Sequence, residues 1–192
     1  STEAIEREAR RVNELHSHVR GEYPAKDGKA APYSARDARH LLWVHCAFTD
    51  SFLRAQIELG YPIALGADRY VQEWAKSAVP LGLNNAPQSA LELQEAIAGF
   101  VVNEVETIAM TPPIVKFILK PPFSKGGLFF YRILANAAIA TIDEPFLTVL
   151  GLKKRSKIWL RVSRKLLDFL SYMLGHESPS QKIARARIQA LQ

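Results

Sequence analysis

Apolar residues recur at steps of three and four along nearly the whole chain, and this spacing restricts the fold more than any other feature. Residues 2–20 carry such a repeat, formed by Ile5, Ala9, Val12, Leu15 and Val19. A repeat of this kind places the apolar side chains on one face of an α-helix. Strands would require alternating apolar and polar residues joined by tight turns, and no such run or Asn-Gly hairpin signal is present. The sequence therefore predicts an all-α protein.

Glycine, proline and capping residues divide the chain into about seven to nine helices. We expect helices over residues 2–20, 36–59, 67–79, 89–110, 111–119, 128–142, 143–150, 157–174 and 179–191. Residues 22–33 are expected to form a polar loop, and residues 34–37 (SARD) match a capping box for the second helix. Ser178 and Pro179 are expected to begin the last helix. Residues 128–142 are apolar nearly all round, which predicts burial on most sides.

Composition excludes several classes of protein. The chain has 192 residues, the size of a single domain, and it is 48% hydrophobic and 23% charged, which excludes a disordered class. Its one cysteine, Cys46, excludes a disulfide framework and a cysteine-based zinc or iron–sulfur site. No apolar run reaches the roughly 18 residues of a membrane-spanning helix, and the charged first residues lack the apolar core of a signal peptide. We therefore expect a reduced, cytoplasmic protein.

Basic residues concentrate in the last fifth of the chain. Residues 151–192 hold ten basic and two acidic residues, whereas residues 1–150 hold fifteen basic and seventeen acidic ones. A basic amphipathic helix with a tryptophan near one end, as in residues 157–174, is typical of peripheral contact with an anionic membrane. The plainer alternative is a solvated helix face. A nucleic-acid partner is not expected, because no basic stretch with interleaved aromatic residues and no helix-turn-helix signature stands out.

The usual catalytic motifs are missing, which leaves the histidines as the candidate site residues. The sequence contains no phosphate-binding glycine loop, no G-x-S-x-G and no H-E-x-x-H, and it has no Glu-x-x-His motif, as a helical di-iron site would require. The five histidines are His16, His18, His40, His45 and His176. His16 and His18 lie about 200° apart around one helix and cannot face the same ligand. His16 lies beside the apolar side of the first helix. We interpret His45 as a buried imidazole that ties two helices together.

Several sequence blocks together resemble one known family. They are RRVNELHSHVRG at residues 10–21, YSARD at 33–37, LLWVHCAFTDS at 41–51 and YVQEW at 70–74, with a looser IDEPF…GL stretch within 139–152. On these blocks, most of residues 10–152 resembles the catalytic domain of the MpaB/rubber oxygenase (latex clearing protein) family. The spacing between the H-x-x-V-x-G block and the L-L-W-V-H block is the most specific part of this resemblance.

The resemblance implies a globin-like helical bundle that binds haem b, with His16 as the proximal ligand of the iron. His45 is not an iron ligand in this family and reads as a structural or neighbouring residue. The implied reaction is oxygen activation at haem followed by oxidative attack on a hydrophobic, isoprenoid-like substrate. Phenylalanines that line an apolar channel, or simply form the core, are Phe48, Phe52, Phe100, Phe117, Phe123, Phe129 and Phe130. No residue is assigned as the oxygen-activating acid or base.

This sequence departs from the family pattern at its beginning. Family members carry a further segment upstream of the first helix, with an Arg-x-x-x-Thr pair on the distal side of the haem, and half a pocket would hold haem poorly. We expect residues 1–152 to form the oxygenase-like core and residues 153–192 to form basic helices packed on it or appended to it. Two functions stay open: a haem-dependent oxygenase, or a non-catalytic helical binding module with a basic tail that docks on a membrane or a partner.

Overall fold

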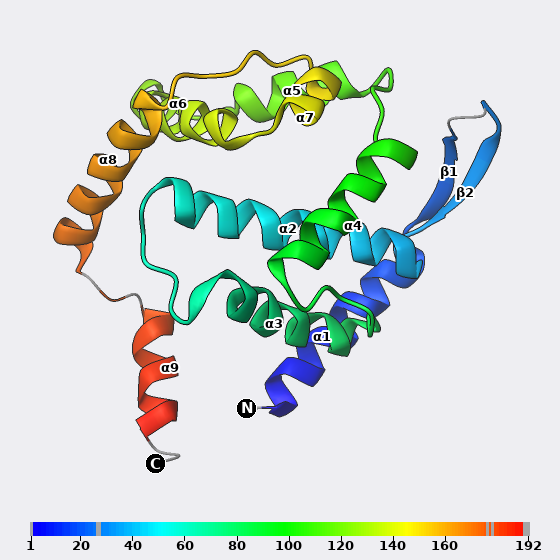
Figure 1. The fold of residues 1–192 in the computed structure, drawn as a ribbon, viewed down its shortest axis with the longest axis horizontal. Coiled ribbons are helices and arrows are strands. Elements are labelled where there is room, and N and C mark those ends of the chain that lie inside the picture. The colour runs from blue at the N-terminus through cyan, green and yellow to red at the C-terminus, as the bar shows by residue number, and fades with distance from the viewer. Residues whose placement is uncertain (1, 26–27, 176, 178, 190–192) are drawn as a thin grey trace.

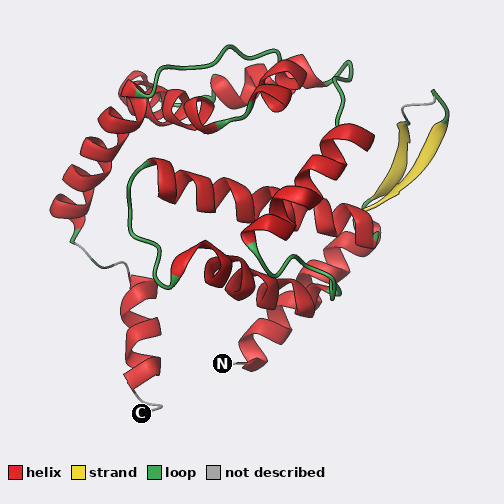
Figure 2. Cartoon of the chain, in the orientation of Figure 1, coloured by secondary structure: helices red, strands yellow, loops and turns green. Residues whose placement is uncertain are grey.

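Helices form nearly all of the regular structure (Figures 1 and 2), which confirms the all-α prediction. The computed structural model describes residues 2–25, 28–175, 177 and 179–189. Its helices are α1 (Thr2–His18), α2 (Ala38–Glu58), α3 (Gly66–Ala78), the short 3-10 helix η1 (Val79–Leu81), α4 (Ala90–Asn103), α5 (Thr111–Leu119), α6 (Lys125–Thr141), α7 (Glu144–Leu150), α8 (Ile158–Leu174) and α9 (Pro179–Gln189). In the described part of the chain, none of these helices is both long and apolar enough to cross a bilayer.

A small antiparallel hairpin replaces the loop predicted over residues 22–33, so that prediction was wrong. Its strands are β1 (Arg20–Pro24) and β2 (Ala30–Ser34), and it projects from the helical body (Figure 2). Neither strand has the alternating pattern that would reveal it. Contacts with α2 hold the hairpin instead, because His40 packs against the rings of Tyr33 and Tyr23 with centroid distances of 4.7 and 6.0 Å.

Helix α2 crosses the centre of the molecule and contributes to its main core cluster (Figure 1). It begins at Asp37, whose carboxylate accepts a hydrogen bond from the backbone N–H of Arg39 at 2.8 Å. The capping box predicted from residue 34 does not form, because Ser34 is part of β2. The buried side chains of α2, α3 and α4 pack in one cluster, formed by Cys46, Leu53, Val71, Leu93 and Ile97.

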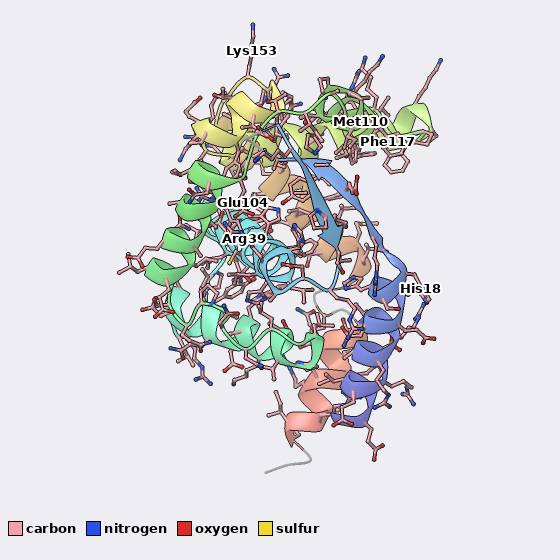
Figure 3. All side chains as sticks on the ribbon, turned by 90° about the vertical axis from the view of Figure 1, so that its right-hand side faces the viewer. His18, Arg39, Glu104, Met110, Phe117 and Lys153 are labelled. Carbon is pink, nitrogen blue, oxygen red and sulfur yellow. The ribbon has the colours of Figure 1, made fainter. Side chains whose placement is uncertain are left out.

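Helix α4 begins where the sequence predicts and ends earlier. Ser89 accepts a hydrogen bond from the backbone N–H of Glu92 at 3.1 Å, and this bond caps the first turn. The predicted end at residue 110 was wrong, because tertiary contacts hold the chain away from the helical path after Asn103. Glu104 forms an ion pair with Arg39 of α2 at 2.8 Å, and Figure 3 shows these two side chains side by side. The Thr107 hydroxyl donates to the Val149 carbonyl.

Helices α5, α6 and α7 lie along the top of Figure 1, and α8 descends from them at the left. Small residues on α6 let α8 approach closely, and Ala137, Ala140 and Leu160 form their shared buried cluster. The predicted burial of residues 128–142 on most sides was wrong: the exposed fractions of Phe129 and Phe130 are 62% and 51%. The reason is that α6 packs on α8 and, less extensively, on α2, which leaves its remaining surface uncovered.

The C-terminal helices follow the predicted boundaries closely. Helix α8 spans Ile158–Leu174 and α9 spans Pro179–Gln189. The predicted cap at Ser178 and the predicted helix end at residue 191 lie outside the described residues, as does His176. The division of the chain at residue 152 stays a prediction.

Candidate functional site

A cavity of about 460 Å³ lies between α2, α6 and α8. Its walls are mainly apolar, and the larger side chains that face it include Trp43, Ile97, Leu134, Phe146, Leu160 and Leu167. A volume of this size, with apolar walls and few polar groups, is typical of a small-molecule site. The geometry therefore makes this cavity the candidate functional site.

The cavity exists because small residues face one another across it. Helix α2 turns Ala47, Ser51 and Ala55 toward it, and α6 turns Ala137 and Ala138 toward it. Protein interiors are close-packed, so a row of larger side chains on either helix would fill this volume. The two rows lie far apart in the sequence, and only the packing of α6 and α8 above α2 brings them together.

Charged residues at one edge of the cavity form a hydrogen-bonded cluster centred on Arg54. The Arg54 guanidinium contacts the Asp50 carboxylate through Nε at 3.2 Å and the Asp143 carboxylate through Nη1 at 2.8 Å. The Gln94 amide donates to Asp50 at 2.7 Å. Asp143 stands at the N-cap of α7, but its side chain makes no capping bond there and binds Arg54. The cluster thereby joins α2 to the start of α7.

The balance of charge in this cluster determines which ligand group it favours. Burial alone would lower the pKa of Arg54, but the hydrogen bonds and charges of Asp50 and Asp143 outweigh burial and raise it. Arg54 is therefore a permanent cation shared by two carboxylates, and one negative charge remains in excess. Such an edge favours a hydrogen-bond donor, for example a hydroxyl group, at the end of an otherwise apolar ligand.

The cavity supplies no axial ligand for haem iron. Iron in haem proteins is held by histidine, cysteine, methionine or tyrosine, and none of these residue types lines the cavity. Among the described residues there is also no group of three or more His, Cys, Asp or Glu side chains that could hold a metal ion. The cavity can therefore bind and orient an apolar molecule, whereas an oxidising group would have to be held elsewhere.

His16 lies on α1 and does not line this cavity. Helix α1 packs on η1, where the Asn13 side chain donates to the Pro80 carbonyl, and the His16 side chain is half-buried. The predicted inward face is largely open, because Leu15 and Ile5 are both 58% exposed. The described residues thus do not fit a haem that is held by His16 and enclosed in this cavity. His18 is exposed and points away from the body (Figure 3), in accordance with the sequence.

His45 is buried, as predicted. Its Nε2 makes no hydrogen bond within the described part of the chain, and burial lowers the pKa of the imidazole. The neighbouring Cys46 is completely buried, and burial together with the Asp50 charge raises the pKa of its thiol to about 11. A thiol with this pKa stays protonated at neutral pH and is neither a nucleophile nor a ready metal ligand.

The residues of the charged cluster were missed from the sequence. Asp50 and Arg54 stand four residues apart on one predicted helix, which is a recognisable signal for an ion pair. The sequence around these residues does not reveal their contact with Asp143, because that contact depends on how α7 packs against α2.

A model of a known family matches most of the chain. The model of the family described as "ER-bound oxygenase mpaB/B'/Rubber oxygenase, catalytic domain" matches residues 1–172. No curated protein and no solved structure matches the chain.

Proposed function

Because this chain belongs to the MpaB/rubber oxygenase catalytic-domain family, we propose that it binds a hydrophobic small molecule in the cavity between α2, α6 and α8 as the substrate of an oxygenase. The observation that carries the proposal is the cavity itself, with about 460 Å³ of mainly apolar space and a charged cluster at one edge. Apolar walls stabilise a hydrocarbon chain by removing it from water.

Each part of the cavity has a separate role in this proposal. Trp43, Phe146 and Leu160 hold the apolar body of the substrate and exclude water. Asp50, with its orientation fixed by Arg54 and Gln94, accepts a hydrogen bond from a polar end group. An isoprenoid alcohol has this combination of a branched hydrocarbon chain and one hydroxyl group.

We further propose haem b as the oxygen-activating group, with His16 as its proximal ligand. The support is the sequence block around His16 within the region that matches the family. Bound haem would supply oxygen activation. Because His16 lies outside the cavity, we assign no chemical step to residues of this chain through that group.

Cavity-filling variants test the substrate site. Ala47→Leu and Ala138→Leu place larger side chains in the cavity, whereas Ala98→Leu adds the same atoms to the exposed side of α4 and is the matched control. We expect the two cavity variants to weaken binding of a fluorescent isoprenoid alcohol by about tenfold or more, because they exclude it sterically. The control should bind normally. Unchanged binding in folded cavity variants would reject the site.

The second candidate function is non-catalytic binding of an apolar ligand, favoured by the lack of an iron ligand in the cavity lining. An absorption spectrum separates the two functions. A haem oxygenase should show a Soret band that His16→Ala removes and His18→Ala retains. A colourless, fully helical protein that still binds the isoprenoid alcohol would support the binding module, and a Soret band that survives His16→Ala would reject His16 as the ligand.

A further inference from the structure

Helix α8 packs on the protein with one side and leaves the opposite side uncovered. Leu160 and Ser163 are buried toward α6, and the Ser163 hydroxyl donates to the Ile133 carbonyl. The opposite side carries an apolar stripe, which we call the outer stripe: Ile158, Val162, Phe169 and Met173. These positions fall on one face of a helix. Phe169 and Met173 are 59% and 63% exposed, so the stripe is open to whatever lies outside the protein.

Cations border the outer stripe. Arg161 and Lys165 lie beside it on α8, and Lys153 and Arg155 lie in the segment that leads into the helix. All four side chains are exposed, and none of them forms an ion pair with another residue that the structure describes. Figure 3 shows Lys153 pointing away from the body. Arg164 differs from these four cations, because it forms an ion pair with Asp168 and donates a hydrogen bond to the Leu59 carbonyl at the end of α2.

The net charge differs between two parts of the chain. Residues 107–174, which contain α5 to α8, hold eleven basic and three acidic residues, whereas residues 1–106 hold eleven basic and fifteen acidic ones. The part that carries the outer stripe is therefore positive, and residues 1–106 are negative. Such a distribution turns α8 toward an anionic surface and turns the rest of the molecule away from it.

We propose that the outer stripe of α8 docks on an anionic lipid membrane, with the helix lying in the plane of the interface. A membrane fits both features, because lipid tails take up the apolar stripe while anionic headgroups pair with Lys153, Arg155, Arg161 and Lys165. A nucleic acid would satisfy only the cations. The opposite side of α8 lines the cavity through Leu160, Ser163 and Leu167, so docking places the cavity next to the lipid. The docking does not rest on oxygenase activity.

Vesicle co-sedimentation with the full chain tests this proposal. We expect binding to phosphatidylcholine vesicles that contain phosphatidylserine, no binding to phosphatidylcholine alone, and weaker binding as salt screens the charges. The triple variant Lys153→Gln/Arg155→Gln/Lys165→Gln should bind about a hundredfold more weakly, at about 1 kcal/mol for each cation. The matched control Arg7→Gln/Arg10→Gln/Arg36→Gln lowers the net charge equally, within the negative residues 1–106, and should bind normally.

Variants of the stripe separate lipid insertion from simple charge attraction. Phe169→Ser and Met173→Ser should each weaken binding by about tenfold, whereas Leu91→Ser, which removes a 68% exposed apolar side chain from α4, should not. Absence of binding at low salt would overturn the proposal. Binding that the stripe variants leave unchanged would also overturn it, as would a dimer in solution that Phe169→Ser dissociates, because a second copy would then cover the stripe.

Discussion

The buried imidazole of His45 makes the folded protein sensitive to acid. Burial lowers its pKa below the ordinary value of 6.5, so the unfolded chain takes up the proton first as pH falls. Above pH 6.5, His45 therefore does not change the free energy of unfolding. Below pH 6.5 and toward the folded pKa, its protonation in the unfolded chain lowers the free energy of unfolding by at most about 1.4 kcal/mol per pH unit. We expect His45→Leu to lose this dependence in denaturant unfolding measured across that range.

The same variant shows whether the buried imidazole lowers or raises the stability of the folded protein. Because Nε2 has no partner in the described structure, His45→Leu should match or exceed the stability of the unmodified protein at neutral pH. His45→Ala should cost about 1–3 kcal/mol through lost packing. His18→Leu is the exposed control and should leave the acid response unchanged. A strongly destabilised His45→Leu variant would show that the imidazole has a stabilising partner.

Cys46 is a probe for opening of the core. Its thiol is completely buried with a pKa of about 11, so both access and ionisation protect it. We expect iodoacetamide to leave the folded protein unmodified at neutral pH and to label Cys46 at the rate at which α2 separates from α3 and α4, as followed by mass spectrometry. Rapid labelling of the folded protein would contradict the packing of this core.

At the scale of elements, Arg164 fastens α8 to the end of α2. Its guanidinium donates to the Leu59 and Gly60 carbonyls at 2.6 Å and lies 4.5 Å from the centre of the Tyr61 ring. A cation is favourable at a helix C-terminus. Arg164→Met should therefore cost about 2 kcal/mol in the free energy of unfolding and increase hydrogen exchange in α8. Arg164→Lys should restore little, because a compact ammonium does not stack on the Tyr61 ring as the planar guanidinium does.

A double-mutant cycle with Gly60 tests this contact directly. Gly60 has a φ of 71°, and an added Cβ would meet Arg164 Nη1 at 2.7 Å. Gly60→Ala should thus carry a backbone cost and a steric cost, and the steric cost should vanish when Arg164 is replaced by methionine. Strictly additive effects on the free energy of unfolding would contradict the contact.

The helices were predictable because their signals are local. The repeat in residues 157–174 and the cap at Ser89 lie within a few residues of the elements that they specify. The hairpin was missed because its stability comes from the packing of Tyr33 on His40, which no alternation in the strands reveals. The early end of α4 was missed for the same reason, since it depends on the ion pair between Glu104 and Arg39.

At the scale of the whole molecule, the family was identifiable from the sequence and the cavity was not. The blocks around His16 and His45 lie in the region that matches the family model. The cavity arises where the small residues Ala47 and Ala138 face each other from helices far apart in the chain. No local sequence pattern predicts that these two helices lie together. The resemblance to the family implied a hydrophobic substrate, but none of the seven phenylalanines named from the sequence as a possible channel lines this cavity.

Photo-crosslinking tests the central claim, that an apolar ligand binds between α2, α6 and α8. The probe is an isoprenoid alcohol that carries a diazirine, and the readout is mass spectrometry of peptides from the irradiated full chain. We predict labels near Trp43, Leu134 and Leu167, which line the cavity, and loss of these labels when unmodified alcohol competes or when Ala138→Leu fills the space. Labels confined to the outer stripe of α8, or labels in the cavity helices that the unmodified alcohol does not reduce, would contradict the account.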